Sequence, residues 1–372
     1  MSQAFSRRSF LRLAAAGTAG FALPLVHEGS LAWAQGMPAR PPPGADVVMI
    51  NSNENPLGPC AAARKALGDI IPDGGRYLFG MTDDLVSTFA SKHGLKPEWV
   101  LPYAGSSEPL QYAVLACTSP KRSLVTANPT YEAAWEAAEQ NGAKSYKVPL
   151  TKDHAHDVRA MLKVTASPGL YYICNPNNPT GTTTPRAAIE ELIAHKPRDS
   201  VVLVDEAYIE FSDEPSVLDL VAAGKDVIVL RTFSKIYGMA GIRCGFAVAR
   251  PDLIKRLALY GSNPMPVTAT GAAIASLKDD TLLPERKRAN AEVRDELFSW
   301  LEAKGHKFTR SASNCFMVDV GRPGKQVIAA MKDRGVYIGR TWELWPNQVR
   351  ITIGTRPEME RFKTAFTAVM AA

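Results

Sequence analysis

Short runs rich in β-branched residues alternate with segments of helical periodicity from about Val47 onward. This alternation constrains the fold most, because a strand–helix–strand order predicts a largely parallel sheet covered by helices. The runs Val201–Val204 and Val227–Leu230 are apolar on both faces, as expected for strands between two layers of helices. The predicted strands are Trp99–Leu101, Ser123–Ala127, Leu170–Cys174, Val201–Asp205, Val227–Arg231 and Cys244–Ala249.

The pattern changes after Pro251, which indicates a second, smaller α/β domain. A helix is followed by a long charged helical stretch at Pro284–Lys304, a strand-like run at Asn314–Val320, another helix and two further strand-like runs. A chain of 372 residues also exceeds the size at which one hydrophobic core keeps growing, so two domains are expected.

Charge and cysteine usage exclude several classes of function. The net charge of +6 is modest and the basic residues are dispersed among acidic ones, so nucleic-acid binding is not indicated. The 5 cysteines lie far apart, with no pair at metal-ligand or redox spacing, so no metal site is predicted and we expect core thiols.

The first 34 residues resemble a twin-arginine signal peptide. Arg7 and Arg8 precede Phe10-Leu11, an Ala/Gly-rich apolar run, and an Ala32-Trp33-Ala34 site after which we expect cleavage. The apolar run is interrupted and too short for a stable membrane anchor. We therefore expect export by the twin-arginine translocase to the periplasm; the alternative is a basic amphipathic start on a cytoplasmic protein.

The segment Arg231–Gly245 directly follows a predicted strand and resembles the Schiff-base lysine segment of class I/II aminotransferases. A lysine held in a tight loop at a strand end has its amine in a fixed position, which suits the formation of a bond to a carbonyl cofactor. The resemblance implies that Lys235 binds pyridoxal 5'-phosphate covalently. Thr232, Ser234 and Arg243 lie close enough along this loop to reach one anion.

Two further strand ends carry residues that match the family. Asp205 ends a buried strand, and the resemblance implies that it pairs with the ring nitrogen of the cofactor, while Tyr208 hydrogen-bonds the ring hydroxyl. Asn175–Gly181 matches the family's loop with two prolines almost letter for letter, and Asn178 is expected to contact the ring and the substrate.

The phosphate of the cofactor has a candidate cradle in Gly105, Ser106 and Ser107, just before a predicted helix at Pro109–Cys117. The same letters would also serve as an ordinary helix cap. The family places an aromatic residue at Tyr131 to stack on the ring, and Tyr77 is expected to reach the cofactor phosphate of a partner subunit in a homodimer.

The residues that bind the substrate are predicted in segments near the two ends of the chain. Arg350 lies in a strand-like run that matches the family, and its planar guanidinium fits a carboxylate or a phosphate. Asn55, in a segment that also matches, and Arg340 are further substrate-binding candidates. Trp342 and Trp345 either line the side-chain pocket or belong to the small-domain core, and the sequence leaves both open.

These segments follow the family's order from Asn53 to Thr355, and within it they look most like histidinol-phosphate aminotransferases. The resemblance implies fold type I of the pyridoxal-phosphate enzymes. The expected division is a signal peptide at 1–34, a Pro-rich tether at 35–46, an N-terminal arm with a small-domain contribution at 47–75, a large cofactor-binding domain at 76–262, and connecting helices with the small domain at 263–372.

The implied reaction moves an amino group from an amino acid to a 2-oxo acid. A periplasmic enzyme would not meet a cytoplasmic histidine intermediate, which favours an amino acid, and two tryptophans in the pocket would favour a large side chain. The alternatives are histidinol phosphate itself as the donor, a decarboxylase resembling threonine-phosphate decarboxylase, and an exported binding or regulatory protein that retains the cofactor site without turnover.

Overall fold

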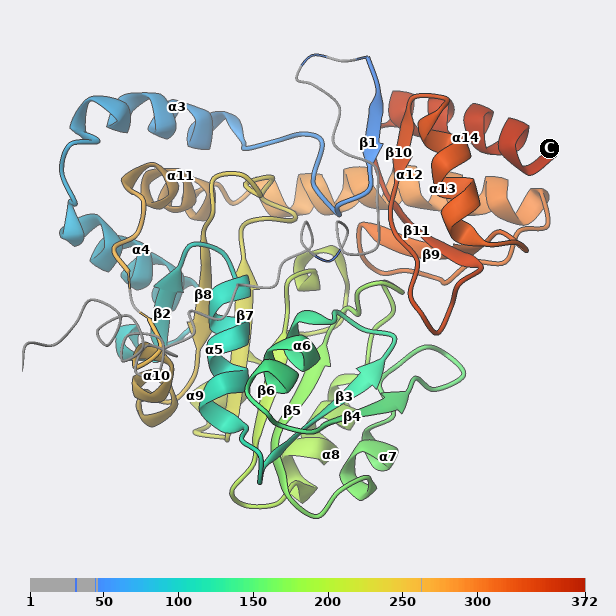
Figure 1. Cartoon of the computed structure of the whole chain (residues 1–372). Helices are drawn as coiled ribbons and strands as arrows, with labels where there is room; N and C mark the ends of the chain where they lie inside the picture. The colour runs from blue at the N-terminus through green and yellow to red at the C-terminus, as the bar shows by residue number, and fades with distance from the viewer. Residues whose placement is uncertain (1–30, 32–43, 45, 262, 372) are drawn as a thin grey trace, which may run out of the picture.

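The computed structural model describes Leu31, Gly44 and residues 46–261 and 263–371 (Figure 1). The predicted signal peptide and nearly all of the predicted tether lie outside the described residues. Within the described part of the chain, no helix has the length and apolar character needed to cross a membrane.

A seven-stranded sheet forms the centre of the large domain. Its order is β2-β8-β7-β6-β5-β3-β4, and only β8 runs antiparallel to its neighbours. This arrangement confirms the predicted, mostly parallel sheet. The strands are β2 (Val100–Tyr103), β3 (Ser123–Asn128), β4 (Ser145–Pro149), β5 (Pro168–Cys174), β6 (Val201–Asp205), β7 (Val227–Thr232) and β8 (Gly245–Val248).

Helices cover both faces of this sheet, and successive residues of one strand supply two separate cores. In β6, Val202 and Val204 pack into one core and Val201 and Leu203 into the other. One face is covered by α5 (Ser107–Cys117), α6 (Ala133–Gln140) and α10 (Pro251–Ala258). The other is covered by α3 (Ala61–Ile70), α4 (Phe79–Lys92), α7 (Val158–Lys163), α8 (Arg186–His195), α9 (Leu218–Ala222) and α11 (Val267–Lys278).

The register brings the carboxyl ends of the parallel strands to one edge. Cys174 of β5 lies beside Asp205 of β6, and Asp205 lies beside Leu230 of β7. The loops that follow these strands therefore begin next to one another, although they are tens of residues apart in the sequence.

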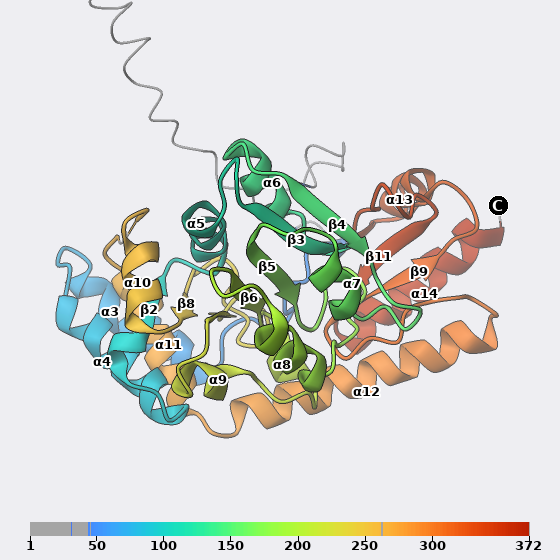
Figure 2. The same cartoon turned by 90° about the horizontal axis from the view of Figure 1, so that it is seen from below.

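The small domain has a core of its own, built from both ends of the described chain. The long helix α12 (Leu282–Ala303) leads into it beside the large domain (Figure 2). β1 (Val48–Ile50) pairs in parallel with β10 (Val336–Ile338), and β9 (Cys315–Asp319) pairs antiparallel with β11 (Gln348–Thr352). The helices α13 (Gly324–Lys332) and α14 (Arg356–Ala371) complete this domain.

Candidate active site

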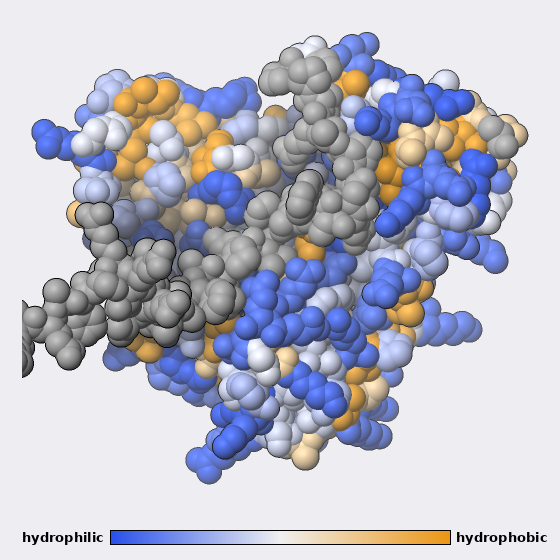
Figure 3. Space-filling view, viewed as in Figure 1, coloured by the Kyte–Doolittle hydropathy of each residue, from blue (hydrophilic) through white to orange (hydrophobic). Residues whose placement is uncertain are grey.

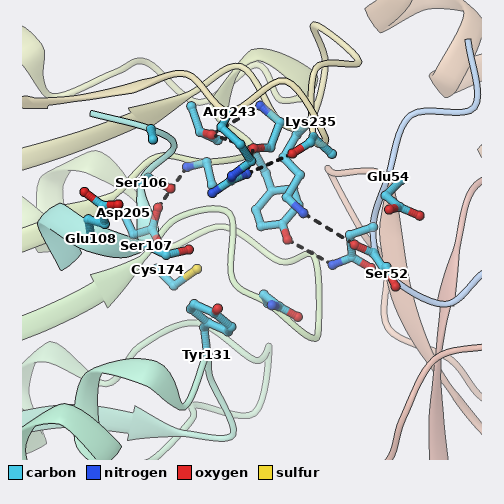
Figure 4. Close-up of a pocket in the computed structure, with 18 residues that line it drawn as sticks. Ser52, Glu54, Ser106, Ser107, Glu108, Tyr131, Cys174, Asp205, Lys235 and Arg243 are labelled. Atoms are coloured by element: carbon cyan, nitrogen blue, oxygen red, sulfur yellow. Dashed lines mark hydrogen bonds between the residues drawn. The ribbon is translucent and has the colours of Figure 1, made fainter. Parts of the chain in front are cut away.

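A cavity of about 680 Å³ is lined by residues that follow the carboxyl ends of the sheet and by Ser52, Asn53 and Glu54, which follow β1. Polar and ionisable residues from many separate segments converge on it, and Figure 4 shows Lys235 and Arg243 directed into the same space. Its lining consists of Ser52, Asn53, Glu54, Ala104, Ser106, Ser107, Glu108, Tyr131, Cys174, Asn178, Asp205, Ala207, Tyr208, Thr232, Ser234, Lys235, Ala240 and Arg243.

Lys235 sits in a tight loop directly after β7. The amide of Ser234 donates to Thr232 Oγ1 at 3.2 Å, and the amide of Gly238 donates to the carbonyl of Lys235 at 3.0 Å, so the backbone on both sides is held. The amine Nζ lies 5.4 Å from the ring centroid of Tyr208 and 3.5 Å from the carbonyl oxygen of Ser52. The amine is thus aimed into the cavity from a fixed backbone.

Asp205 places a carboxylate at the floor of the cavity. Its Oδ2 accepts a hydrogen bond from the hydroxyl of Tyr172 at 3.1 Å, and its Oδ1 accepts one from the amide of Ala207 at 3.2 Å. Burial raises the pKa of Asp205 from 3.8 to about 6, against the lowering effect of these bonds and of Lys235. A cationic ligand group beside Asp205 would offset the cost of burying its charge.

Arg243 and the start of α5 form a site with the character of an anion cradle. Arg243 Nη1 donates to Ser234 Oγ at 3.1 Å and to the carbonyl of Ala240 at 2.9 Å. α5 begins at Ser107, Ser106 and Ser107 both line the cavity, and the side chain of Ser106 makes no capping bond to the amides at this helix start.

Gly105 is required where the cradle is tightest. Its φ is +95°, and a Cβ built there would lie 2.1 Å from Arg243 Nη2. Any larger residue would push the guanidinium away from the cavity.

Tyr208, Asn178 and Tyr131 surround the remaining part of the cavity. The hydroxyl of Tyr208 accepts from Asn53 Nδ2 at 3.0 Å, and Asn178 Oδ1 accepts from Arg350 Nη1 at 3.0 Å. Tyr131 lines the cavity from the loop that precedes α6, on the side away from Lys235 (Figure 4). The arrangement suits a planar ring held between Tyr131 and the strand ends.

Arg350 is fully buried on β11 and reaches the large domain through Asn178. Its Nη2 also donates to the carbonyl of Asn51 at 2.7 Å. Asn178 lines the cavity, so Arg350 stands immediately behind the cavity wall.

Arg340 and Asn55, which the sequence predicts to bind substrate, lie outside the lining of this cavity. The guanidinium of Arg340 makes a bidentate ion pair with Glu132 at 2.7 and 2.6 Å, and Arg340 does not line the cavity. Asn55 Nδ2 donates to the carbonyl of Ile236 at 2.9 Å, and the cavity is lined instead by its neighbours Asn53 and Glu54. Both side chains are therefore occupied by protein partners at the edge of the site.

The two tryptophans do not line the cavity either. Trp342 is buried and donates through Nε1 to the carbonyl of Thr130 at 3.1 Å. The ring of Trp345 meets that of His154 edge-on, with centroids 5.4 Å apart. These contacts dock a small-domain loop onto the large domain, so the pocket-lining alternative does not hold for this cavity.

Tyr77 lies away from the cavity of its own chain. Its side chain is 69% exposed and stacks on Phe79 at the start of α4. The exposed position leaves Tyr77 available to a second subunit.

Several residues that line the cavity or lie next to it are absent from the sequence prediction. Glu108 belongs to the glycine-serine segment but was assigned no role, and burial raises its pKa while Arg243 lowers it. Cys174 ends β5 immediately before the Asn175–Gly181 loop, so its adjacency to that loop was the available signal. Glu132 directly follows Tyr131, but nothing local indicates that it pairs with Arg340.

The cavity residues fit pyridoxal phosphate. The cradle of Arg243, Ser234 and the α5 start suits a phosphate dianion, and a Cβ at Gly105 would fill it. The buried carboxylate of Asp205 suits a protonated ring nitrogen, and Lys235 supplies the amine that bonds an aldehyde. The described residues contain no group of side chains suited to hold a metal ion.

Comparison with known proteins agrees with this geometry. The sequence profile of the family described as aminotransferase class I and II matches residues 45–366. The chain belongs to this family.

Two relatives of this aminotransferase carry different names. It is 36% identical to a histidinol-phosphate aminotransferase of Moorella thermoacetica over 88% of this chain and 86% of the relative. It is 34% identical to an aromatic amino acid aminotransferase of Rhodococcus jostii over 90% of this chain and 93% of the relative.

A solved structure is also similar along the whole chain. It is a histidinol-phosphate aminotransferase of Sinorhizobium meliloti in complex with pyridoxal 5'-phosphate, with a TM-score of 0.80, 25% identity and coverage of 99% of both chains. The protein is thus a pyridoxal-phosphate-dependent aminotransferase of fold type I.

Proposed function

We propose that the amino donor of this aminotransferase is an amino acid whose α-carboxylate is bound by Arg350, and that the acceptor is a 2-oxo acid. The observation that carries this proposal is the contrast between two neighbouring arginines. Arg340 makes a bidentate pair with Glu132, whereas Arg350 donates to Asn178, which lines the cavity. One guanidinium matches the single charge of a carboxylate, in a planar bidentate geometry.

Residues on opposite sides of the cavity divide the chemistry between them. Bound pyridoxal phosphate supplies an aldehyde that bonds an amine and a cationic ring that accepts electrons. Lys235 would hold that group through its Nζ, and the same Nζ would move the proton at the α-carbon of the donor. The negative charge of Asp205 would keep the ring nitrogen protonated, and Tyr208 and Asn178 would hydrogen-bond the ring hydroxyl.

The phosphate end is assigned to the cradle on the other side. Arg243 provides the positive charge, and hydroxyl and amide donors come from Ser106, Ser107, Thr232 and Ser234. Gly105 has no side chain and so leaves space for the phosphate. Tyr131 is assigned to the face of the ring. Holding both ends of the cofactor fixes the bond to be broken relative to Lys235 Nζ.

Candidate donors are uncharged amino acids with a large side chain. The similarity to the Rhodococcus aromatic amino acid aminotransferase supports such donors, while the comparable similarity to histidinol-phosphate aminotransferases supports histidinol phosphate. The neutralisation of Arg340 favours the amino acid, because a phosphate dianion would call for a second available cation.

The test is the visible absorption spectrum of the purified holoenzyme during addition of single amino acids or histidinol phosphate, without any acceptor. Loss of the cofactor's visible band with an amino acid, together with release of the matching 2-oxo acid, is the expected result. Reaction with histidinol phosphate alone would refute the proposal. Release of carbon dioxide without a 2-oxo acid would instead support the decarboxylase.

We further propose a homodimer in which Tyr77 reaches the partner's cofactor phosphate. Exposed apolar side chains at Ile71, Tyr77 and Phe79 support such an interface, and Figure 3 shows apolar residues gathered over the α3 and α11 side of the molecule. Light scattering after gel filtration is expected to give twice the mass of the chain. A monomer that retains full activity would refute the shared site.

The site of action proposed for the enzyme is the periplasm, reached through the twin-arginine translocase. The support is the order of Arg7-Arg8, the apolar run and Ala32-Trp33-Ala34. Replacing both arginines by lysine is expected to retain the protein in the cytoplasm. Unchanged recovery from the periplasm would refute the twin-arginine route.

A further inference from the structure

Two buried arginines stand side by side behind the cavity wall. The amide of Gly339 donates to the carbonyl of Arg350 at 2.8 Å, and the amide of Arg350 donates to the carbonyl of Arg340 at 3.1 Å. Both arginines have a relative exposure of 0%. Their guanidinium carbons lie 4.1 Å (Arg340) and 5.5 Å (Arg350) from the ring centroid of Trp342. Two adjacent buried cations of this kind are suited to an anion with two charges.

Glu132 pairs with Arg340, the first of these two arginines. Its two carboxylate oxygens accept from the two terminal nitrogens of Arg340 at 2.7 and 2.6 Å. Glu132 is itself buried, at 7% exposure, and directly follows Tyr131, which lines the cavity. The negative charge of Glu132 is therefore fixed beside the arginine pair.

Contacts on both sides hold Glu132 in this position. It is the residue before the first turn of α6, and the indole of Trp342 donates to the carbonyl of Thr130, two residues earlier. The loop that carries Arg340 and the loop that carries Glu132 are thus joined at two points. A bound substrate would have to break this bidentate pair to use Arg340, which would leave a buried carboxylate without its counter-charge.

We propose that Glu132 is a specificity-determining residue. Its carboxylate gives Arg340 the negative charge that a doubly charged substrate would otherwise provide. The aminotransferase then accepts donors with one anionic group at this end and excludes donors with a phosphate dianion there. This inference rests on the proposed function, because it assumes that Arg350 binds the donor's anionic group. Glu132 acts through Arg340 and does not touch the reacting atoms.

The direct test is Glu132→Gln in the holoenzyme, with inorganic phosphate as the probe. The glutamine side chain keeps the size of the original and one acceptor oxygen but removes the charge. Phosphate is then expected to inhibit the reaction with an amino acid donor with an inhibition constant lowered by about tenfold, because one repelling charge near the site is gone. Binding of phosphate measured by calorimetry should tighten by the same factor.

Glu139→Gln is the matched control. Glu139 lies on α6, the helix that Glu132 precedes, but its side chain is half exposed and pairs with Lys147 at 3.3 Å. The inhibition constant for phosphate is expected to stay at its wild-type value. If the inhibition constant for phosphate fell equally in this control, the net charge of the protein, and not the Glu132–Arg340 pair, would govern phosphate binding. That result would overturn the proposal.

Two further variants complete the test, and one of them serves if Glu132→Gln does not fold. The double change Glu132→Gln and Arg340→Gln removes both charges of the buried pair, and it should return the inhibition constant to near the wild-type value. Glu132→Asp keeps a carboxylate but withdraws it by one methylene, so a smaller fall of the constant is expected if Glu132→Gln does not fold. If Glu132→Gln folds, an unchanged inhibition constant for phosphate in that variant would overturn the proposal. If it does not fold, an unchanged inhibition constant in Glu132→Asp would do so.

The failure of this inference can be distinguished from failure of the proposed function. The proposed function is judged on the wild-type enzyme alone and fails if histidinol phosphate reacts and no amino acid does. The role of Glu132 fails if the wild type reacts with an amino acid while the change at Glu132 leaves the inhibition constant for phosphate unaltered.

Discussion

Replacing Asp205 by Asn should stabilise the cofactor-free protein while abolishing its function. Asp205 is 4% exposed, and burial raises its pKa from 3.8 to about 6, which corresponds to about 3 kcal/mol. The folded protein therefore holds this proton more tightly than the unfolded chain does. The contribution of Asp205 to the free energy of unfolding accordingly falls as the pH rises from about 4 to about 6, and it stays low above that range.

The Asn variant removes this cost without losing the local contacts. Its amide oxygen can accept from the amide of Ala207, and its NH₂ group can donate to the hydroxyl of Tyr172, in place of the bonds that Asp205 makes. At pH 7 the free energy of unfolding is expected to rise by about 2–3 kcal/mol, and at about pH 4 the gain should vanish because Asp205 is then largely neutral in the folded protein and its burial carries little cost.

Urea unfolding of the cofactor-free protein at one fixed protein concentration measures this gain. Asp83→Asn, on the exposed side of α4, is the matched control, with an expected change below about 0.5 kcal/mol. An Asn variant that is no more stable than the wild type at pH 7, or whose gain persists at pH 4, would refute the reasoning from burial. Transamination should be lost in the same variant, because no charge then keeps the ring nitrogen protonated.

Three other substitutions test separate parts of the site. Lys235→Ala should abolish turnover and the visible cofactor band while leaving the circular dichroism unchanged; retained activity would contradict its role. Arg350→Ala should raise KM for an amino acid by about a hundredfold, as expected for the loss of a charged hydrogen-bonded pair; unchanged KM and kcat would contradict its role as the anion site. Gly105→Ala, whose Cβ would lie 2.1 Å from Arg243 Nη2, should weaken the binding of pyridoxal phosphate by about tenfold or more in a fluorescence titration, and an unchanged affinity would argue against the cradle.

Strand positions in the large domain were predictable because burial on both faces leaves a strong signal. β6 begins and ends where the run Val201–Asp205 predicts, and β7 is one residue longer than predicted. β4, at Ser145–Pro149, was not predicted, because an edge strand with exposed polar residues lacks this pattern. β1 has only three residues, and its partner β10 lies almost 300 residues later, so local sequence does not reveal it.

The cavity residues were predictable where a whole segment carries the chemistry. Lys235, Asp205, Asn178 and Arg243 lie together as the order of segments predicts, because the loops that carry them meet at the same edge of the sheet. The side-chain partner of Arg340 was not predictable. Glu132 lies 208 residues away, and the pair depends on how the small domain docks on the large one.

The most direct test of the central claim is to reduce the holoenzyme with borohydride and map its peptides by mass spectrometry. Reduction makes permanent any bond between the cofactor and a lysine. The phosphopyridoxyl group is expected on the peptide that contains Lys235, and addition of a reactive amino acid before reduction should prevent this labelling. A label on another lysine, or no label on a protein that shows the visible band, would contradict the assignment of Lys235.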